Sequence, residues 1–570
     1  MKLKTLTIEN FRNFKNTEIK LSNKNIVFGM NDVGKTNLLW SLRFLLDRKI
    51  RVMGFSESDF HQKKTTETIK ITLEVELKDG DRDSQNIISK VKGSRNSNEL
   101  NIFYFEVVGK FEASEGIGIP ILFWGNNLEK LDEIPQNGNF STLDKLFNIL
   151  YIDPTIDLDR VFSGNRRKIF NEKKMSENDV EIYDEISQLT SSMNEKISSM
   201  GIIKSFQKEL TSEYKQLKDE DVSIELQSEM AIKGFFSDIH PYLKKQGDAI
   251  LYPTSGDGRK KILAYSLLNY LNKEYDSERI TIYLIEEPEN SLHRSMQIAL
   301  SKQLFEYGVY NYFILSTHSA ELLYEMDDAS LIRVYSKGNT MCSSKLYKVP
   351  GNFKFIKKEL NAALATALFS NRVLLIEGPS EKVLFEKILT IVKPTYELEG
   401  GYLLLVDGIK FKPYYKILKE LNIIPIVKTD NDFKSKRGQP NSFDLIGLNR
   451  CLELISQDKL DAIEINYSLE ERERKVIENK KDIYDREEKK VSKLEKDNIY
   501  ISRVDLEHDL YTVIPDKMNE VFGSGNPISN MQNKKLINML KLIDKLSDEE
   551  CYRIIEASDF KCLKSLVQNI

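Results

Sequence analysis

The chain has 570 residues, of which 41% are apolar and 30% charged, and its formal net charge at pH 7 is −4. This length predicts about two to four domains. The composition excludes an intrinsically disordered protein, and the charge excludes a general attraction to nucleic acid. The four cysteines form no CxxC pair, which argues against structural zinc and predicts a cytoplasmic location.

The first predicted elements are an N-terminal strand and a nucleotide-binding loop. The start, MKLKTLTIENFRNFKN, alternates polar and apolar positions and has no signal-peptide core, and no stretch approaches the ~18 apolar residues of a membrane span. The stretch IVFGMNDVGKTNLLW then places Gly29, Gly34, Lys35 and Thr36 in the pattern GxxxxGK(S/T). Backbone N–H groups of such a loop surround phosphate oxygens, Lys35 reaches the β/γ-phosphates, and Thr36 binds Mg²⁺. A plain strand-to-helix turn is the weaker alternative.

The region from about residue 165 to 230 has apolar residues at helical spacing and no strand signal. It predicts a helical insertion, which is either a covering helix pair or a dimerisation arm. The motifs that follow predict the rest of a nucleotide site. A small turn, Ser255 to Gly258, opens a helix, and a strand from Ile280 to Ile285 ends in Glu286 and Glu287. A later strand in YFILSTHSAELL ends at His318.

This order of motifs resembles the heads of ABC-type ATPases, and most closely the SMC and RecF-like branch. The resemblance implies that Glu286 holds the metal with Thr36, although aspartate is more usual there, and that Glu287 and His318 assist the attacking water. It also implies at least a dimer, because the signature turn closes over nucleotide bound by a partner subunit. The implied nucleotide-binding residues are Gly29, Asn31, Gly34, Lys35, Thr36, Asn37, Ser255 and Gly256.

A second α/β pattern starts near residue 349. The stretch RVLLIEGPSEKVLFEKIL predicts a strand ending at Glu377 and a helix with Glu381 in its first turn, and IIPIVKTDND ends in Asp430 and Asp432. Carboxyl ends of strands gather at one edge of a parallel sheet, so we expect these four acids to converge. Such a cluster needs cations, and oxygen ligands select Mg²⁺, Mn²⁺ or Ca²⁺. Two ions about 4 Å apart would support phosphodiester cleavage.

A strand ending in Glu-Gly followed by a strand ending in DxD resembles the Toprim domain. An ABC-type head followed by Toprim resembles the OLD (overcoming lysogenization defect) nucleases, and most closely the branch of the Gabija anti-phage system. The resemblance implies further metal ligands at Asp505 and Glu507, and a lysine at Lys535, or alternatively Lys534, that stabilises charge on the scissile phosphate. It also implies double-stranded DNA as substrate, a homotetramer and a helicase-like partner subunit.

The expected architecture is α/β, with an ABC-type P-loop ATPase head interrupted by a helical insertion and followed by a Toprim domain. Residues 467–498 predict a charged helical insertion, read either as a solvated surface helix or as a short coiled hairpin. Basic residues around Lys412 and Lys436 are either a solvated face or a polyanion track. The expected ranges are 1–164 and 231–348 for the ATPase halves, 165–230 for the insertion, and 349–570 for Toprim.

The sequence therefore predicts a nucleotide-regulated, divalent-metal-dependent DNA endonuclease, either nicking or cutting both strands, with ATP and Mg²⁺ or Mn²⁺ as cofactors. The alternative is a non-cleaving DNA-binding ATPase clamp with a scaffold Toprim domain. A primase of the Toprim class is disfavoured because the scattered cysteines offer no zinc-binding array.

Overall fold

In a computed structural model, the chain forms two compact units, which are described separately. The larger comprises Met1–Tyr151, Ile282–Glu289 and Arg294–Ile570, and the smaller comprises Ile152–Thr281 and Asn290–His293. Among the described residues, no helix has the length and apolar character needed to cross a membrane. The structure describes residues 1–30, 33–91, 101–134, 136–137, 140–156, 158–169, 176–217, 223–227, 242–244, 251–253, 256–275, 278–306, 310–406, 411–468 and 470–568.

The chain begins in a six-stranded sheet with the order β2-β1-β4-β5-β6-β7. The predicted N-terminal strand is β1, in which Leu6 and Ile8 are fully buried, as the alternation of the sequence requires. The strands are β1 (Lys2–Phe11), β2 (Phe14–Lys20), β4 (Ile69–Glu76), β5 (Ile102–Glu112), β6 (Ile117–Gly125) and β7 (Asp132–Glu133). Short elements beside them are α2 (Arg48–Arg51), η1 (Glu57–Asp59), η2 (His61–Lys63), α3 (Arg82–Lys90), β8 (Gln136–Asn137), β9 (Phe140–Ser141) and α4 (Thr142–Leu146).

A second six-stranded sheet, with the order β10-β13-β14-β3-β15-β16, carries the nucleotide-binding loop. Strands β13, β14, β3 and β15 are parallel neighbours, so the ends of β13 and β14 lie beside the loop that follows β3. The strands are β3 (Lys24–Phe28), β10 (Phe147–Ile152), β13 (Ile280–Glu286), β14 (Phe313–Ser316), β15 (Ala329–Lys337) and β16 (Asn339–Tyr347). The accompanying helices are α1 (Lys35–Leu46), α9 (Arg294–Phe305), η5 (Glu321–Leu323), η6 (Gly351–Ile356) and α10 (Lys357–Leu368).

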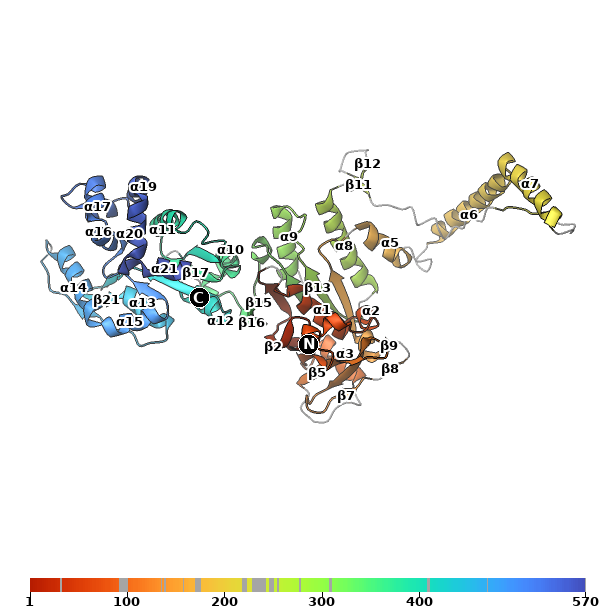
Figure 1. The fold of residues 1–570 in the computed structure, drawn as a ribbon, viewed down its shortest axis with the longest axis horizontal. Coiled ribbons are helices and arrows are strands. Elements are labelled where there is room, and N and C mark those ends of the chain that lie inside the picture. Colours follow the sequence, from red (N-terminus) through yellow and green to blue (C-terminus); the bar gives the residue numbers. More distant parts are fainter. Residues whose placement is uncertain are drawn as a thin grey trace. The chain divides into compact units, whose positions relative to one another are not determined.

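The smaller unit is mainly helical and contains the predicted insertion. Helix α6 starts at a capping box formed by Ser176 and Asp179, and none of its residues is buried in the described structure. Figure 1 shows α6 and α7 as a pair of consecutive helices in yellow. The elements are α5 (Leu158–Ile169), α6 (Glu177–Ser198), α7 (Gly201–Leu217), β11 (Tyr242–Lys244), β12 (Leu251–Pro253) and α8 (Asp257–Tyr275).

The C-terminal part of the larger unit is built on a four-stranded parallel sheet with the order β18-β17-β19-β23. Apolar residues of these strands pack against the following helices in one core, which includes Leu374, Ile426 and Phe385. Burial of each large apolar side chain contributes about 1.5–3 kcal/mol. The elements, in green to dark blue in Figure 1, are β17 (Arg372–Ile376), α11 (Pro379–Val392), β18 (Gly401–Leu405), α12 (Phe411–Glu420), β19 (Ile424–Thr429), β23 (Ile499–Ile501), α16 (Leu506–Val513), α17 (Pro515–Phe522), α18 (Pro527–Gln532), α19 (Lys535–Lys545), α20 (Asp548–Glu556), η7 (Ser558–Phe560) and α21 (Lys561–Val567).

Between β19 and β23 the chain forms a side lobe, residues 433–496. The charged stretch predicted as one helical insertion consists of two helices that meet at Glu487, and it buries Ile483, Val491 and Leu494. The remaining lobe is a three-stranded sheet in the order β20-β21-β22 together with α13. The elements are β20 (Phe433–Lys436), β21 (Gln439–Leu445), α13 (Ile446–Leu454), β22 (Ile463–Glu464), α14 (Arg472–Arg486) and α15 (Glu488–Lys496).

Candidate metal centre and nucleotide site

The carboxyl edge of the parallel sheet carries a cluster of acids. Glu377 directly follows β17, Asp430 directly follows β19, and Asp505 caps α16 shortly after β23. Because these strands are parallel neighbours, their ends meet at one edge. We call the acidic cluster the five residues whose charges or contacts meet there, namely Glu377, Glu381, Asp430, Asp505 and Glu507.

Asp430 lies at the centre of the acidic cluster. Its Oδ1 accepts a hydrogen bond from the backbone N–H of Leu506 at 3.0 Å, and Lys535 Nζ lies 3.7 Å from its Oδ2. Burial, followed by the charge of Glu381, raises the pKa of Asp430 well above its ordinary value. This carboxylate is therefore held in place in an environment that disfavours its own negative charge.

Glu377 and Glu381 are placed differently within the cluster. Glu377 Oε1 accepts hydrogen bonds from Thr429 and from Arg450, and Arg450 Nη1 also donates to Thr429 Oγ1 at 2.8 Å. Glu381 Oε2 accepts from the backbone N–H groups of Glu377 and Gly378, at 2.5 and 3.0 Å, so it caps the first turn of α11. Burial and the charge of Glu377 raise the pKa of Glu381 to about 7.

Glu507 and Asp505 complete the cluster from α16. Glu507 is 1% exposed, its carboxylate oxygens meet the full geometry of a hydrogen bond with none of the described residues, and Lys535 Nζ lies 3.2 Å from Oε1. Asp505 Oδ1 lies 2.6 Å from His508 Nδ1, while Gln532 Nε2 donates to Oδ2 at 3.0 Å. Burial would raise the pKa of Asp505, but the contacts with His508 outweigh it and lower the pKa.

Lys535 and Arg450 are cationic side chains that contact acids of the cluster. Burial alone would lower the pKa of Lys535, but Asp430 and Glu507 outweigh it and raise the pKa. Lys534, the alternative lysine, is exposed and has a left-handed backbone (φ 64°), so the turn before α19 directs Lys535 to the cluster. Asp432 has its carboxylate 3.9 Å from Lys480 Nζ and is half-exposed. The sequence predicts that Asp430 and Asp432 face the same site. In the structure Asp430 lies in the acidic cluster, whereas the carboxylate of Asp432 lies near Lys480.

The donor chemistry of the acidic cluster fits divalent cations that prefer oxygen. Its oxygens are all carboxylates, and a buried carboxylate with no hydrogen-bond donor, such as Glu507, needs a cation nearby. In the described residues no group of three or more His, Cys, Asp and Glu side chains is already arranged to hold a metal ion. The ion pairs explain this arrangement, because Lys535 and Arg450 supply the positive charge beside Glu507, Asp430 and Glu377.

The nucleotide site joins the loop after β3 to the end of β13. Thr36 Oγ1 donates to Glu286 Oε1, and Tyr151 donates to the other oxygen of the same carboxylate. Lys35 Nζ donates to the carbonyl oxygens of Gly29 and Met30 at 3.2 and 2.8 Å. The predicted pair of Thr36 and Glu286 is thus in direct contact, and Lys35 rests on the loop into which phosphates are expected to bind.

His318 and Glu287 face each other across the ends of β14 and β13. His318 Nε2 lies 3.5 Å from Glu287 Oε1, and burial followed by the charge of Lys35 lowers the pKa of His318. Sequence reasoning missed Glu289, whose Oε1 accepts from Thr317 Oγ1 at 2.9 Å and from the backbone N–H of His318 at 2.5 Å. Glu289 therefore fixes the turn that carries His318.

The structure gives less direct evidence for the other residues that were predicted to bind nucleotide. The amide of Asn37 donates to Asn13 Oδ1 at 2.9 Å and accepts from Arg12 Nη1 at 3.0 Å, so it braces α1 against the turn after β1. Gly256 directly precedes α8 in the smaller unit. Asn31 and Ser255 lie outside the described residues.

Two family models match the chain. The model for an AAA ATPase domain matches residues 1–149 and 126–323, and the model for the Toprim domain of overcoming lysogenization defect-like proteins matches residues 368–432. These matches and the parallel sheets confirm the expected fold class, a P-loop ATPase followed by Toprim. A solved SMC head domain from Thermotoga maritima is 13% identical and covers 61% of this chain and 100% of its own, but its TM-score of 0.32 adds nothing to this assignment.

The fold and the acidic edge define an ATPase–Toprim protein of the OLD class. Old nuclease of Escherichia phage P2 is 22% identical over 67% of this chain and 68% of its own length. Endonuclease GajA of Bacillus cereus (strain VD045) is 50% identical over 100% of this chain and 99% of its own. The chain belongs to the family of endonuclease GajA.

Proposed function

We propose that this chain is a nucleotide-regulated, divalent-metal-dependent DNA endonuclease of anti-phage defence. The observation that carries the proposal is the convergence of Glu377, Asp430 and Glu507 with Lys535 at the carboxyl edge of the Toprim sheet. A scaffold domain has no need to bury carboxylates such as Asp430 and Glu507 beside one another, because burial and neighbouring negative charges disfavour their ionised forms and destabilise the fold. The alternative of a non-cleaving clamp leaves this cost unexplained.

The residues have distinct roles in the proposed reaction. Glu377, Asp430 and Glu507 hold Mg²⁺ or Mn²⁺, with Asp505, Glu381 and Asp432 as the further ligands expected from the sequence. When bound, the ions supply an activated water and neutralise charge on the phosphodiester. Lys535 donates to the scissile phosphate, and His508 with Gln532 holds Asp505 in place. In the ATPase, Lys35, Thr36 and Glu286 bind ATP with Mg²⁺, and Glu287 and His318 orient water.

Nicking of a supercoiled plasmid tests the proposal directly. The wild type should relax the plasmid with Mg²⁺ or Mn²⁺, and Glu377→Gln and Asp430→Asn should not, with unchanged thermal melting as evidence of folding. If no metal or nucleotide condition supports cleavage by the wild type, or if both variants cleave normally, the proposal is wrong. Adding ATP, ADP or a non-hydrolysable analogue to wild type and to Lys35→Ala shows how nucleotide regulates cleavage.

The proposed assembly is a homodimer through the ATPase heads, with a tetramer formed through α6 and α7, and a helicase-like partner subunit. Helix α6 has no buried residue, and exposed apolar side chains on this helix pair include Leu189, Ile202 and Phe206. Several large apolar side chains exposed on one helix pair support an interface there. In sedimentation velocity, Leu189→Glu with Ile202→Glu should yield smaller assemblies than the control Glu185→Gln. If the double variant sediments as the wild type does, α6 and α7 form a covering helix pair and not a dimerisation arm. The free cysteines support a cytoplasmic location.

A further inference from the structure

A pocket of about 670 Å³ lies between the side lobe and the start of α12, next to the acidic cluster. It lies between the start of α12, helix α13, the β20–β21 hairpin and the segment before β22. Its lining includes Lys412, Lys436, Arg450 and Lys459 together with Asp444, Glu453 and Asp461, so cationic side chains outnumber carboxylates. The Toprim family model ends at residue 432 and does not cover the side lobe.

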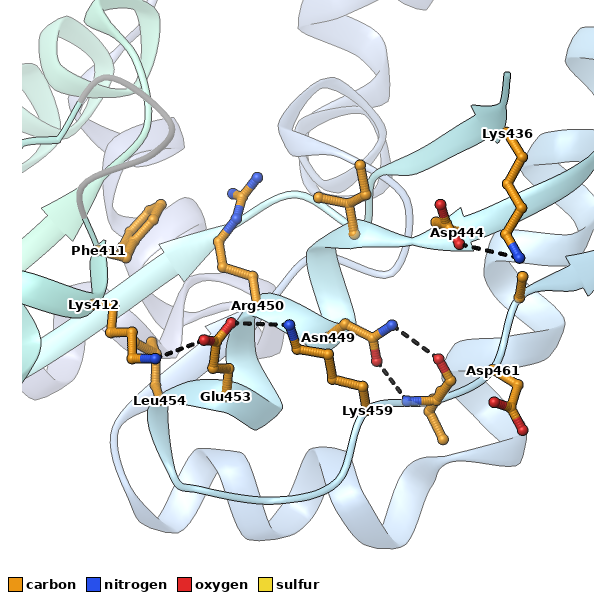
Figure 2. A pocket seen from close by; sticks show the side chains of 13 residues that line it. Phe411, Lys412, Lys436, Asp444, Asn449, Arg450, Glu453, Leu454, Lys459 and Asp461 are labelled. Carbon is orange, nitrogen blue, oxygen red and sulfur yellow. Dashed lines mark hydrogen bonds and ion pairs between the residues drawn. The ribbon is translucent and has the colours of Figure 1, made fainter. Parts of the chain in front are cut away.

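Figure 2 shows how the charged residues of this pocket are paired. Lys412 and Lys459 reach the carboxylate of Glu453 from opposite sides, at 2.6 and 3.3 Å. Both lysines are more than 60% exposed, with values of 63% and 62%. Exposed ion pairs of this kind are worth only about 0–1 kcal/mol, so a phosphate group can take the place of the shared carboxylate.

Arg450 lies where the pocket meets the acidic cluster, and its position is fixed by α13. The helix begins so close to the DxD segment that a Cβ at Gly447 would lie 2.2 Å from the carbonyl oxygen of Asp430. One turn later, Arg450 contacts Glu377 and Thr429. On the same helix, Asn449 forms two hydrogen bonds with the backbone of Leu460, which fixes the opposite wall.

Arg450 is paired with Glu377, which is also a proposed ligand of the metal ion. Glu377 follows β17 at the carboxyl edge, and an ion bound at this carboxylate would compete with the guanidinium for its negative charge. Arg450 is then left beside the pocket, where it still donates to Thr429 and has further donors with which to bind another anion. The anion that this site must receive is phosphate, and a guanidinium is suited to bind phosphate oxygens through two donors.

We propose that this pocket receives the DNA strand next to the cleaved phosphodiester, and that Arg450 is its phosphate-binding residue, exchanged from Glu377 to the DNA backbone when divalent metal binds. The inference rests on the proposed endonuclease function. Lys412, Lys436 and Lys459 bind neighbouring phosphates at the rim. Arg450 thus makes DNA binding dependent on metal, because without metal its guanidinium remains on Glu377.

The experiment measures DNA binding and metal binding separately. Fluorescence anisotropy of a labelled duplex is recorded over a range of salt concentrations, with EDTA and with Ca²⁺, and Mn²⁺ binding is measured by electron paramagnetic resonance. With Ca²⁺, Arg450→Ala should weaken DNA binding about 10- to 100-fold and lower the salt-dependence slope by about one. With EDTA it should bind DNA as the wild type does, and its Mn²⁺ binding should be equal or tighter.

The controls separate this inference from a purely structural role. Arg450→Lys should recover part of the Ca²⁺-dependent binding, whereas Arg474→Ala, which changes an exposed arginine of α14, should change none of these values. If Arg450→Ala weakens Mn²⁺ binding and leaves DNA binding unchanged, Arg450 is a brace for Glu377 and the inference is overturned. If the wild type cleaves plasmid but Arg450→Ala binds DNA normally with Ca²⁺, the inference fails and the endonuclease function stands.

Discussion

Lys428 Nζ lies 2.8 Å from Asp509 Oδ2, and the two side chains are 1% and 3% exposed. Lys428 also donates to the carbonyl oxygen of Asp559 at 3.0 Å. The pair ties β19, which ends at the acidic cluster, to α16, which carries Glu507. The strand position before Thr429 thus carries a buried cation.

Lys428→Met should destabilise the protein by about 3–5 kcal/mol, because it leaves the buried Asp509 carboxylate without its partner. The control is Lys419→Met, which removes an exposed partner of Asp497 and should cost less than about 1 kcal/mol. Urea unfolding of both variants measures the difference. Equal stabilities for the two variants would show that the buried pair contributes no more than a surface one.

We expect substitutions of the neighbouring residues Lys535 and Lys534 to have opposite effects on cleavage. Lys535→Ala should abolish cleavage while Mn²⁺ binding remains, because in the proposed reaction the lysine acts on the phosphate, and removal of its charge does not weaken cation binding. Lys534→Gly should cleave at the wild-type rate, and it should be slightly stabilised because its left-handed backbone suits glycine. Plasmid nicking and thermal melting measure both effects. If Lys534→Gly is defective in cleavage and Lys535→Ala is not, Lys534 is the lysine that acts on the scissile phosphate.

Metal binding should become tighter as pH rises through about 7, because burial raises the pKa of Glu381 to about 7 and the acid must lose its proton to face a cation. The sign follows from protonation: below this pKa the carboxyl group is neutral, and protons compete with the metal. Calorimetric titration of Mn²⁺ between about pH 6 and pH 8 measures the dependence. Glu381→Gln still offers an oxygen to cap α11 and should flatten the profile. If Glu381→Gln leaves the pH profile of Mn²⁺ binding unchanged, the pH dependence is due to Asp430 and not to Glu381.

The acidic edge was predictable because it follows from strand direction alone. Parallel strands that end in Glu377 and Asp430 must bring those residues together, whatever the loops do. Asp432 shows where this reasoning stops: the residues after Thr429 are no longer in a strand, so the alternation of sides does not extend to them. Asp505, Glu507 and Lys535 were predicted only through the family resemblance.

Other site residues were missed for different physical reasons. Arg450 lies in the side lobe, and no local pattern in α13 indicates that one of its turns faces Glu377. His508 does carry a signal, because it stands three residues after the helix-capping Asp505. Glu381 was expected to face the same point as Glu377, and the structure adds that its carboxylate caps α11. Long-range packing, which the sequence pattern does not encode locally, decides the position of Arg450.

Gly34→Ala should abolish ATP binding without unfolding the chain. A Cβ at this position would lie 1.9 Å from Asn13 Nδ2, and φ is 108°, so either the loop after β3 or the Asn13 side chain, which donates to the carbonyl oxygen of Val33 at 2.8 Å, must shift. Gly80→Ala is the matched control, since Gly80 has a similar φ of 79° but nothing within 4 Å of an added Cβ. The control should lose about 1–2 kcal/mol of stability and bind nucleotide normally. Binding of a fluorescent ATP analogue and thermal melting distinguish the two, and normal binding by Gly34→Ala would show that the loop tolerates displacement.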